Sequence, residues 1–207
     1  MIVTRPPRRT QQERRAATVA RLVDAAIAAI GEVGYQRATV HEICGRAGLS
    51  TGAMFRQFAS RLDLIVCAAA AIVARQLDEF RVLTTGLSDG EDLLDVSLRF
   101  LRQAQSAPAT HALREIYLAA RSDPELRARI APLADGYYRD IVAAVNEAGV
   151  LDRFPDRNRE PLFFAMLYLF SGEAVVRGVH DRPDLTESVL ALLEDMLSVY
   201  ARARGEP

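Results

Sequence analysis

The stretch AGLSTGAMFRQFASRLDLI, residues 47–65, combines small, aromatic and basic side chains in a pattern that suits contact with DNA. Met54 and Phe58 stand four residues apart, on a helix face that would join a core. The remaining positions would face outward: Thr51, Gly52, Ala53, Phe55 and Gln57. Gly52 and Ala53 are small enough to let a helix approach base edges in a major groove about 12 Å wide. The first turn of such a helix also offers N–H groups and partial positive charge to phosphates.

Phe55 admits two interpretations. It lies four residues after Thr51 on the outward stripe, so its ring could contact DNA. Packing against a neighbouring helix fits the same spacing equally well.

His41 is not part of a zinc motif. The pair HE at 41 and 42 lacks the second histidine of the motif H-E-x-x-H, because position 45 is Gly. A DNA contact or a solvated side chain is therefore expected for His41, and a metal ligand is not.

Short helices must position these residues. Thr39 is a plausible N-cap for a helix that carries Val40, Ile43, Cys44 and Ala47 and ends at Gly48. Ser50 would cap the next helix after the four-residue turn AGLS. Two short helices joined in this way predict a helix-turn-helix.

The rest of the chain also shows helical periodicity, without the alternating pattern of strands. Before the motif, residues 11–33 have apolar residues on one face and Gly34 at the end. After it, Ser60 caps a helix from about residue 61 past 77 towards 83. Further helices are predicted over 89–105, 109–121, 124–147, 157–179 and 184–204, with a bend near Pro132 in the third of these. The expected fold class is all-α, with about nine helices.

Charge is distributed unevenly along the chain. Residues 1–62 hold ten Arg and four acidic residues, a balance of +6, whereas the whole chain carries −1, so residues 63–207 carry −7. A basic segment on an acidic body suggests that the segment meets a polyanion. The leader RPPRR, residues 5–9, is either a solvated tail or an arm that touches DNA.

Several other classes of protein lack support. The longest uncharged apolar run, residues 64–74, is too short to span a bilayer, and the polar, basic start is not a secretory signal, so a cytoplasmic protein without membrane association is expected. Cys44 and Cys67 lie in apolar helical patterns, which favours small core side chains over a disulfide or metal site. No nucleophile–base pair, phosphate loop or metal-ligand spacing indicates an enzyme, and no cofactor is implied.

Residues 15–65 resemble the DNA-binding head of the TetR family of bacterial one-component repressors. The resemblance rests on RLVDAAIAAIGEVGYQRATVHEICGRAGLSTGAMFRQFASRLDLI. This segment contains an amphipathic first helix, the pair GY, a Thr before the second helix, AGLS and a glycine two residues past that Ser. The motif near Phe58 and Arg61 matches the family's aromatic segment and its following SKexL.

The resemblance implies a set of DNA contacts. The residues matching Thr39 and His41 approach DNA from the second helix, and those matching Thr51, Gly52 and Ala53 approach bases from the third. Phe55 replaces the usual tyrosine, which removes a hydrogen bond to phosphate and leaves an apolar contact. Gln57 stands where His or Tyr often touches phosphate, and Arg61 replaces a Lys that clamps phosphate. The implied set is Thr39, His41, Ser50, Thr51, Gly52, Ala53, Phe55, Arg56, Gln57 and Arg61.

The expected domains are an arm and helix-turn-helix head over 1–62 and a ligand-binding and dimerisation domain over 63–207. The last two helices carry broad apolar faces that must be covered. By resemblance they pair with their copies in a homodimer; completing the subunit core is the alternative. The candidate interface residues are Leu162, Phe163, Met166, Phe170, Leu193, Met196, Leu197 and Tyr200.

The middle helices would then enclose a cavity for a small-molecule effector. Candidate lining residues are polar or aromatic side chains in apolar stretches, each of which could instead be structural: His111, Arg114, Tyr117, Tyr137, Tyr138, Phe164 and Tyr168. Their mixed aromatic and basic character indicates a flat or acidic molecule. The resulting hypothesis is a bacterial, nucleoid-associated repressor released from a near-palindromic operator in double-stranded DNA by a small molecule. The alternative is a small-molecule carrier or scaffold of the same fold that does not bind DNA.

Overall fold

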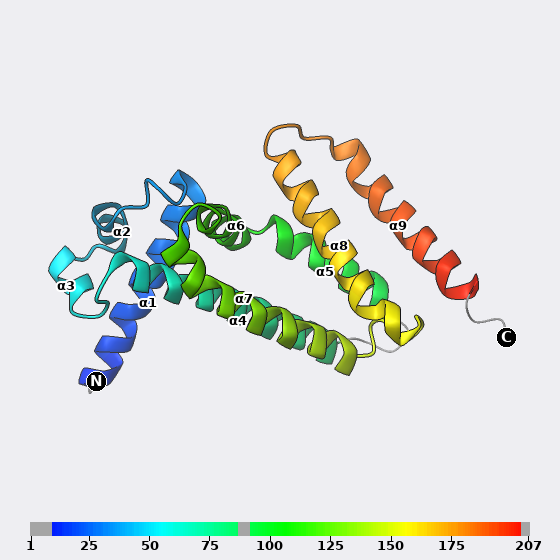
Figure 1. Ribbon diagram of the computed structural model, residues 1–207, viewed down its shortest axis with the longest axis horizontal. Coiled ribbons are helices and arrows are strands. Elements are labelled where there is room, and N and C mark those ends of the chain that lie inside the picture. Colours follow the sequence, from blue (N-terminus) through cyan, green and yellow to red (C-terminus); the bar gives the residue numbers. More distant parts are fainter. Residues whose placement is uncertain (1–9, 87–91, 204–207) are drawn as a thin grey trace, which may run out of the picture. The chain divides into compact units, whose positions relative to one another are not determined.

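The computed structural model describes residues 10–86 and 92–203, and every regular element in these ranges is a helix (Figure 1). The helices are α1 (Gln11–Val33), α2 (Val40–Ala47), α3 (Thr51–Phe55), α4 (Arg61–Thr85), α5 (Leu93–Ser106), α6 (Pro108–Ala120), α7 (Pro124–Glu147), α8 (Asp156–Arg177) and α9 (Pro183–Ala203). The all-α prediction is confirmed. The leader RPPRR and positions 89–91 of the predicted fifth helix lie outside the described residues. Among the described helices, none combines the length and apolar character needed to cross a membrane.

The chain packs as two compact units. Unit 1 takes in the chain up to Ile72 together with His111–Leu133, and unit 2 takes in Val73–Thr110 and the chain from Ala134 onward. These units are defined by packing alone. The functional division expected after residue 62 stays a prediction.

Unit 1 has a core built on the apolar face of α1. Leu22, Ala26 and Ile30 follow at helical spacing and are fully buried, as are Ile43 of α2 and Met54 of α3. Burying a side chain of this size contributes about 1.5–3 kcal/mol. This small core holds the second and third helices at a fixed angle to the first, which is the condition for presenting α3.

Hydroxyl groups begin the helices of unit 1. Thr39 Oγ1 accepts the N–H of Glu42 at 3.2 Å, and Ser50 Oγ accepts the N–H of Ala53 at 3.1 Å. Ser60 Oγ in the same way accepts the N–H of Asp63 at the start of α4. Each cap satisfies an amide that has no partner within its helix. All three predicted caps are confirmed.

The turn between α2 and α3 depends on Gly48. Its φ of 60° and ψ of 39° lie in the left-handed region, where a side chain is disfavoured. A Cβ there would also stand 3.3 Å from a terminal nitrogen of Arg21, which donates a hydrogen bond to the carbonyl of Ala47 at 2.5 Å. The glycine therefore allows both the sharp turn and the close approach of α1.

Unit 2 has a separate apolar core, in which α5 packs on α8. A salt bridge joins these two helices within the unit: Arg102 of α5 donates from Nε and from a terminal nitrogen to the carboxylate of Glu173, at 3.0 and 2.5 Å. Ser171 Oγ donates to Gln105 Oε1 at 2.7 Å beside it. Arg102 is buried, so both hydrogen bonds are needed to offset the cost of removing its charge from water.

Candidate nucleic-acid interface and ligand cavity

The short helix α3 presents an uneven surface. Thr51, Gly52 and Phe55 are exposed, and 54% of Phe55 is open to solvent. Ala53 is only 8% exposed and lies beside the fully buried Met54. The prediction that Ala53 faces outward is therefore wrong: it packs in the head. A five-residue helix has room for one outward stripe, which runs from Thr51 to Phe55.

Gly52 has open space where a side chain would be. A Cβ added at this position would meet nothing closer than Ser50 Oγ, at 4.0 Å. Neither unit 1 packing nor a positive φ requires glycine here. The open space gives α3 a flat surface that another molecule can approach to backbone distance.

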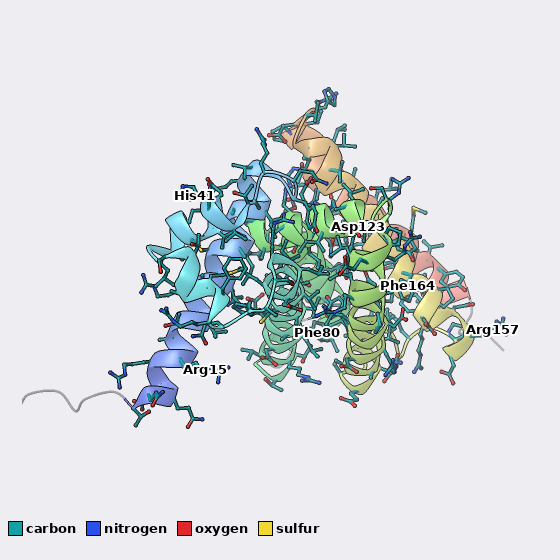
Figure 2. All side chains as sticks on the ribbon, turned by 60° about the vertical axis from the view of Figure 1, so that its left-hand side comes forward. Arg15, His41, Phe80, Asp123, Arg157 and Phe164 are labelled. Carbon is teal, nitrogen blue, oxygen red and sulfur yellow. The ribbon has the colours of Figure 1, made fainter. Side chains whose placement is uncertain are left out.

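The start of α2 exposes Thr39 and His41, and Figure 2 shows His41 on the outside of this helix. Ser50 is exposed as well, although its hydroxyl already caps α3. Thr39 and Ser50 thus have a defined structural role through their side-chain oxygens. Any contact that they make with a ligand must use their remaining hydrogen-bonding capacity or their backbone.

Arg56 and Gln57 follow α3 at its end. Arg56 is exposed, whereas Gln57 is half-buried and its Oε1 accepts a hydrogen bond from Nε of Arg15 at 3.1 Å. Arg15 lies in the first turns of α1, where it is labelled in Figure 2. This bond joins two segments 42 residues apart in sequence and brings a second guanidinium to the end of α3.

Arg61 has partners inside unit 1. Its Nε donates to the carbonyl of Ala38 at 2.8 Å, a terminal nitrogen donates to the carbonyl of Tyr35, and its guanidinium carbon lies 4.5 Å from the Tyr35 ring centre. The guanidinium therefore secures the loop between α1 and α2, and its contact with phosphate stays a prediction. Sequence reasoning missed this role of Tyr35, although the pair GY marked the position.

Charges around the head are partly neutralised. Arg46 forms salt bridges with Glu32 at 2.5 Å and with Glu42 at 2.7 Å. Asp63 accepts from Arg129 at 2.8 Å and from Ser60 Oγ at 2.8 Å. The hydrogen bond from Arg129, followed by that from Ser60, lowers the pKa of Asp63. The excess positive charge is then carried by arginines such as Arg56.

A cavity lies within unit 2, with about 50 Å³ of space that the centre of a water-sized sphere can occupy. Side chains from α4, α5, α7 and α8 and from the segment after α7 form the wall: Gln76, Phe80, Leu94, Ser97, Leu98, Phe100, Leu101, Ala104, Gln105, Tyr137, Ile141, Val145, Val150, Leu151, Phe163, Met166 and Leu167. Most of them are apolar. Burial raises the pKa of Tyr137, and the neighbouring Tyr138 adds to the shift, so the Tyr137 hydroxyl stays neutral.

Most of the residues predicted to bind the ligand do not line this cavity. Only Tyr137 lines it. His111, Arg114 and Tyr117 belong to unit 1, where burial lowers the pKa of Arg114. Sequence reasoning looked for polar residues in apolar stretches, whereas the wall is made of the apolar positions themselves.

Three other predicted ligand residues form an aromatic cluster in unit 2. The ring centres of Tyr138 and Phe164 lie 5.6 Å apart, and those of Phe164 and Tyr168 lie 5.7 Å apart. Tyr168 is two-thirds exposed. The cluster thus runs from half-buried rings to the surface, and none of the three lines the cavity described above.

Most of the predicted dimer residues belong to the core of one subunit. Phe163, Met166, Phe170 and Leu197 are buried in the single chain, and Leu162, Leu193 and Tyr200 are half-buried against the same core. Met196 alone of the eight is well exposed, at 60%. The assignment of the buried four to an interface is therefore wrong, because a second copy could not cover them.

A different apolar surface runs along α8 and α9. On α9 the exposed residues recur at alternating spacings of four and three: Leu185, Val189, Leu192, Met196 and Val199. On α8 the same spacing gives Ala165, Leu169, Gly172 and Val176, and Val179 continues the row two residues past the end of the helix. We call these two rows the α8 and α9 stripes. Both helices are thus apolar on two sides, and the sequence signal for the outer side was hidden by the inner one.

The two cysteines are free thiols. Cys44 is buried and Cys67 half-buried, and burial raises the pKa of each thiol. Among the residues that the structure describes, no three His, Cys, Asp or Glu side chains gather in a way that could hold a metal ion.

Comparison with known proteins agrees with the helix-turn-helix geometry. The profile of bacterial regulatory proteins of the tetR family matches residues 22–66. An uncharacterized HTH-type transcriptional regulator of Mycobacterium tuberculosis is 34% identical over 190 residues, which cover 92% of this chain and 97% of the relative.

Solved structures share the fold. The fatty acid degradation regulator FadR from Bacillus halodurans superposes with a TM-score of 0.62 at 23% identity, over 84% of this chain and 96% of its own. A transcriptional regulator from Saccharomonospora viridis in complex with choline gives a TM-score of 0.67 at 18% identity, over 91% and 97%. With the near full-length relative and the matched head, the chain belongs to the tetR family of bacterial regulatory proteins and is a DNA-binding transcriptional regulator.

Proposed function

We propose that the protein is a homodimeric repressor that binds a near-palindromic operator through two copies of its head and leaves it when a small molecule fills the cavity of unit 2. It would act in the bacterial cytoplasm, on the nucleoid, with residues 1–62 as the DNA-binding domain and 63–207 as the domain for ligand and partner.

The outward stripe of α3 carries the DNA-binding part of this proposal. Thr51, Gly52 and Phe55 are exposed, and the open space at Gly52 would let the helix backbone approach base edges. Thr39 and His41 are exposed on the helix before it, and Arg56 follows it as a candidate phosphate contact. Ala53 is left out, and Arg61 is retained only as a residue that positions the head.

The α8 and α9 stripes support the homodimer. Ten apolar or small residues in two helical rows are exposed in the single chain. Such a surface is unfavourable in water unless another molecule covers it. A second copy would cover it with the same two stripes, because a twofold interface is self-complementary. Two heads related in this way would read half-sites about 34 Å apart.

The cavity supports regulation by a ligand. Release requires that the ligand bind the DNA-free state more tightly than the DNA-bound state, and the effect is then reciprocal: operator DNA weakens ligand binding by the same factor. Met166 and Phe163 of α8 line the cavity within the unit that also carries the stripes. A ligand can therefore alter the packing of a helix that we assign to the dimer.

The test is a gel-shift with the DNA upstream of the protein's own gene, read with Arg56→Ala and, as control, Arg139→Ala on exposed α7 surface. We expect retardation by the wild type and by Arg139→Ala. Arg56→Ala removes one phosphate contact from each of the two heads, so it should weaken binding and lower the salt slope by about two units. Absence of retardation at low salt with any near-palindrome would instead support a carrier or scaffold.

A further inference from the structure

The wall of the unit 2 cavity is uncharged. Among the seventeen described residues that line it, none is Asp, Glu, Arg or His, and the polar members are Gln76, Ser97, Gln105 and Tyr137. Arg102 on the same helix is already engaged: it donates two hydrogen bonds to Glu173 and lies 3.7 Å from Glu187. A charged group inside this cavity would therefore lack a counter-charge among the residues that line it.

Ser97 differs from Gln76 and Gln105, two other polar residues of the wall, whose side chains have hydrogen-bond partners. Gln76 Nε2 donates to Thr110 Oγ1 at 2.7 Å, and Gln105 Oε1 accepts from Ser171 Oγ at 2.7 Å. The hydroxyl of Ser97 is buried, with 8% of the residue exposed, and it has no hydrogen-bond partner among the described residues. A buried hydroxyl without a partner is destabilising, so its retention calls for an explanation.

The position of Ser97 on α5 sharpens the point. It lies three residues after Leu94 and four before Leu101, and both of these leucines line the cavity. An apolar side chain would fit the pattern of this helix face. The serine places one donor and acceptor in an apolar wall.

We propose that the cavity takes an uncharged, largely apolar ligand that carries one hydrogen-bonding group and sets it against Ser97 Oγ. This inference rests on the proposed role of the cavity as the effector site. The sequence predicts a flat or acidic molecule, and this inference replaces the acidic alternative, because the basic residues behind it, Arg114 and His111, do not line the cavity.

Charge decides between ligand classes. A carboxylate in this wall would lose its hydration without meeting a cation. A cationic head, like the choline bound by the Saccharomonospora regulator, could use the rings of Phe80, Phe100 and Phe163. The cation–π attraction is smaller than the penalty for burying an ion without a partner, so the neutral ligand is favoured.

The test is calorimetric titration of the full-length protein, without DNA, with four probes on one skeleton: 4-phenyl-1-butanol, 4-phenylbutanoate, 4-phenylbutylammonium and butylbenzene. We expect the alcohol to bind at least about tenfold more tightly than either ion. Ser97→Ala should weaken the alcohol about fivefold and leave butylbenzene equal or tighter, because the apolar probe leaves the wild-type hydroxyl unpaired. Ser122→Ala, an exposed serine outside unit 2, is the matched control and should change neither.

Location is tested by filling the cavity. Ala104→Phe should abolish binding of the alcohol, and the smaller Ala104→Leu should weaken it, with helical circular dichroism unchanged in the latter. The inference is overturned if either ion binds as tightly as the alcohol, if Ser97→Ala does not alter the preference for alcohol over butylbenzene, if Ala104→Leu binds as the wild type does, or if no probe binds.

Failure of the inference can be told from failure of the proposed function. Operator binding by the gel-shift does not depend on these probes, so a protein that binds DNA and rejects the alcohol refutes only the ligand class. A protein that binds the alcohol through Ser97 yet keeps its operator affinity supports the ligand class and refutes release by this site.

Discussion

The guanidinium carbon of Arg61 lies 4.5 Å from the centre of the Tyr35 ring, and its nitrogens donate to the carbonyls of Tyr35 and Ala38. The first residue of α4 thereby holds the loop that precedes α2. A basic residue at this point in the sequence suggests a phosphate contact, but the geometry gives it a structural role. Its effect on DNA binding should then follow from how well the head is folded.

We expect Arg61→Ala to lower the free energy of unfolding by about 2 kcal/mol, since two hydrogen bonds and one cation–π contact are lost. Arg61→Lys should recover only part of this, because an ammonium cannot reproduce the planar fork. Thermal denaturation measures both, and Arg56→Ala is the control with an unchanged midpoint. If Arg61→Ala is as stable as the wild type but binds DNA more weakly, Arg61 contacts a DNA phosphate directly.

Gly52→Ala should separate stability from DNA binding. The added methyl has open space in the protein, and alanine is the better helix former, so the thermal midpoint should be equal or slightly higher. At a surface pressed against base edges the same methyl is overpacking, which should cost about 1–3 kcal/mol of operator affinity. Gly136→Ala on α7, also without neighbours at its Cβ, should raise the thermal midpoint for the same reason and leave operator affinity unchanged. Unchanged affinity in a gel-shift would show that Gly52 does not face DNA.

Charges placed in the α8 and α9 stripes should disrupt the homodimer. Val176→Glu and Leu192→Glu each introduce a carboxylate that an interface would bury unpaired, and the twofold axis would place two of them there. Light scattering after size exclusion should give a monomer, with operator binding lost. Val82→Glu, at an exposed valine on α4, keeps the dimer if the stripes are the interface. If both stripe variants form dimers as stable as those of the wild type, the α8 and α9 stripes are not the dimer interface.

Acid should remove the contribution of Asp63. Its pKa is lowered by the hydrogen bond from Arg129 and then that from Ser60, so its carboxylate stabilises the fold above the unfolded value of about 3.9. That contribution is lost as the pH falls through the lower folded value. The difference in thermal midpoint between wild type and Asp63→Asn should therefore be largest near pH 6 and shrink towards pH 3. Asp135→Asn, on the exposed surface of α7, supplies the baseline; a difference that grows in acid would contradict the assignment.

Local signals in the sequence predicted the elements well. Thr39, Ser50 and Ser60 cap helices in the structure through contacts three residues away, and Gly48 adopts the conformation that the turn requires. These interactions depend on neighbours in sequence. For that reason residue type and spacing were enough to place them.

Long-range packing was predicted less well. Ala53 was placed outward because it was among the positions left once Met54 and Phe58 were assigned to the core. Burial depends on what lies opposite, and only the folded core shows that. Phe163 and Met166 were assigned to a dimer surface because they lie on a broad apolar face and the family resemblance implies that this helix pairs with its copy. Periodicity alone does not say whether such a face meets a second chain or a cavity. Ser97 drew no attention because an isolated serine in a helix gives no local signal.

Helix α8 has apolar residues on both its inner and its outer side, and this has a mechanical consequence. Its inner side carries Phe163 and Met166 of the cavity wall. Its outer side carries Val176 of the α8 stripe, which we propose contacts the second copy of the chain. Both sets of residues belong to one continuous helix, so a ligand that displaces the inner side of α8 also displaces the residues on its outer side. Ligand binding could then change the dimer interface without a chain of intermediate residues. A variant that shortens α8 should impair ligand binding and the response of the dimer together.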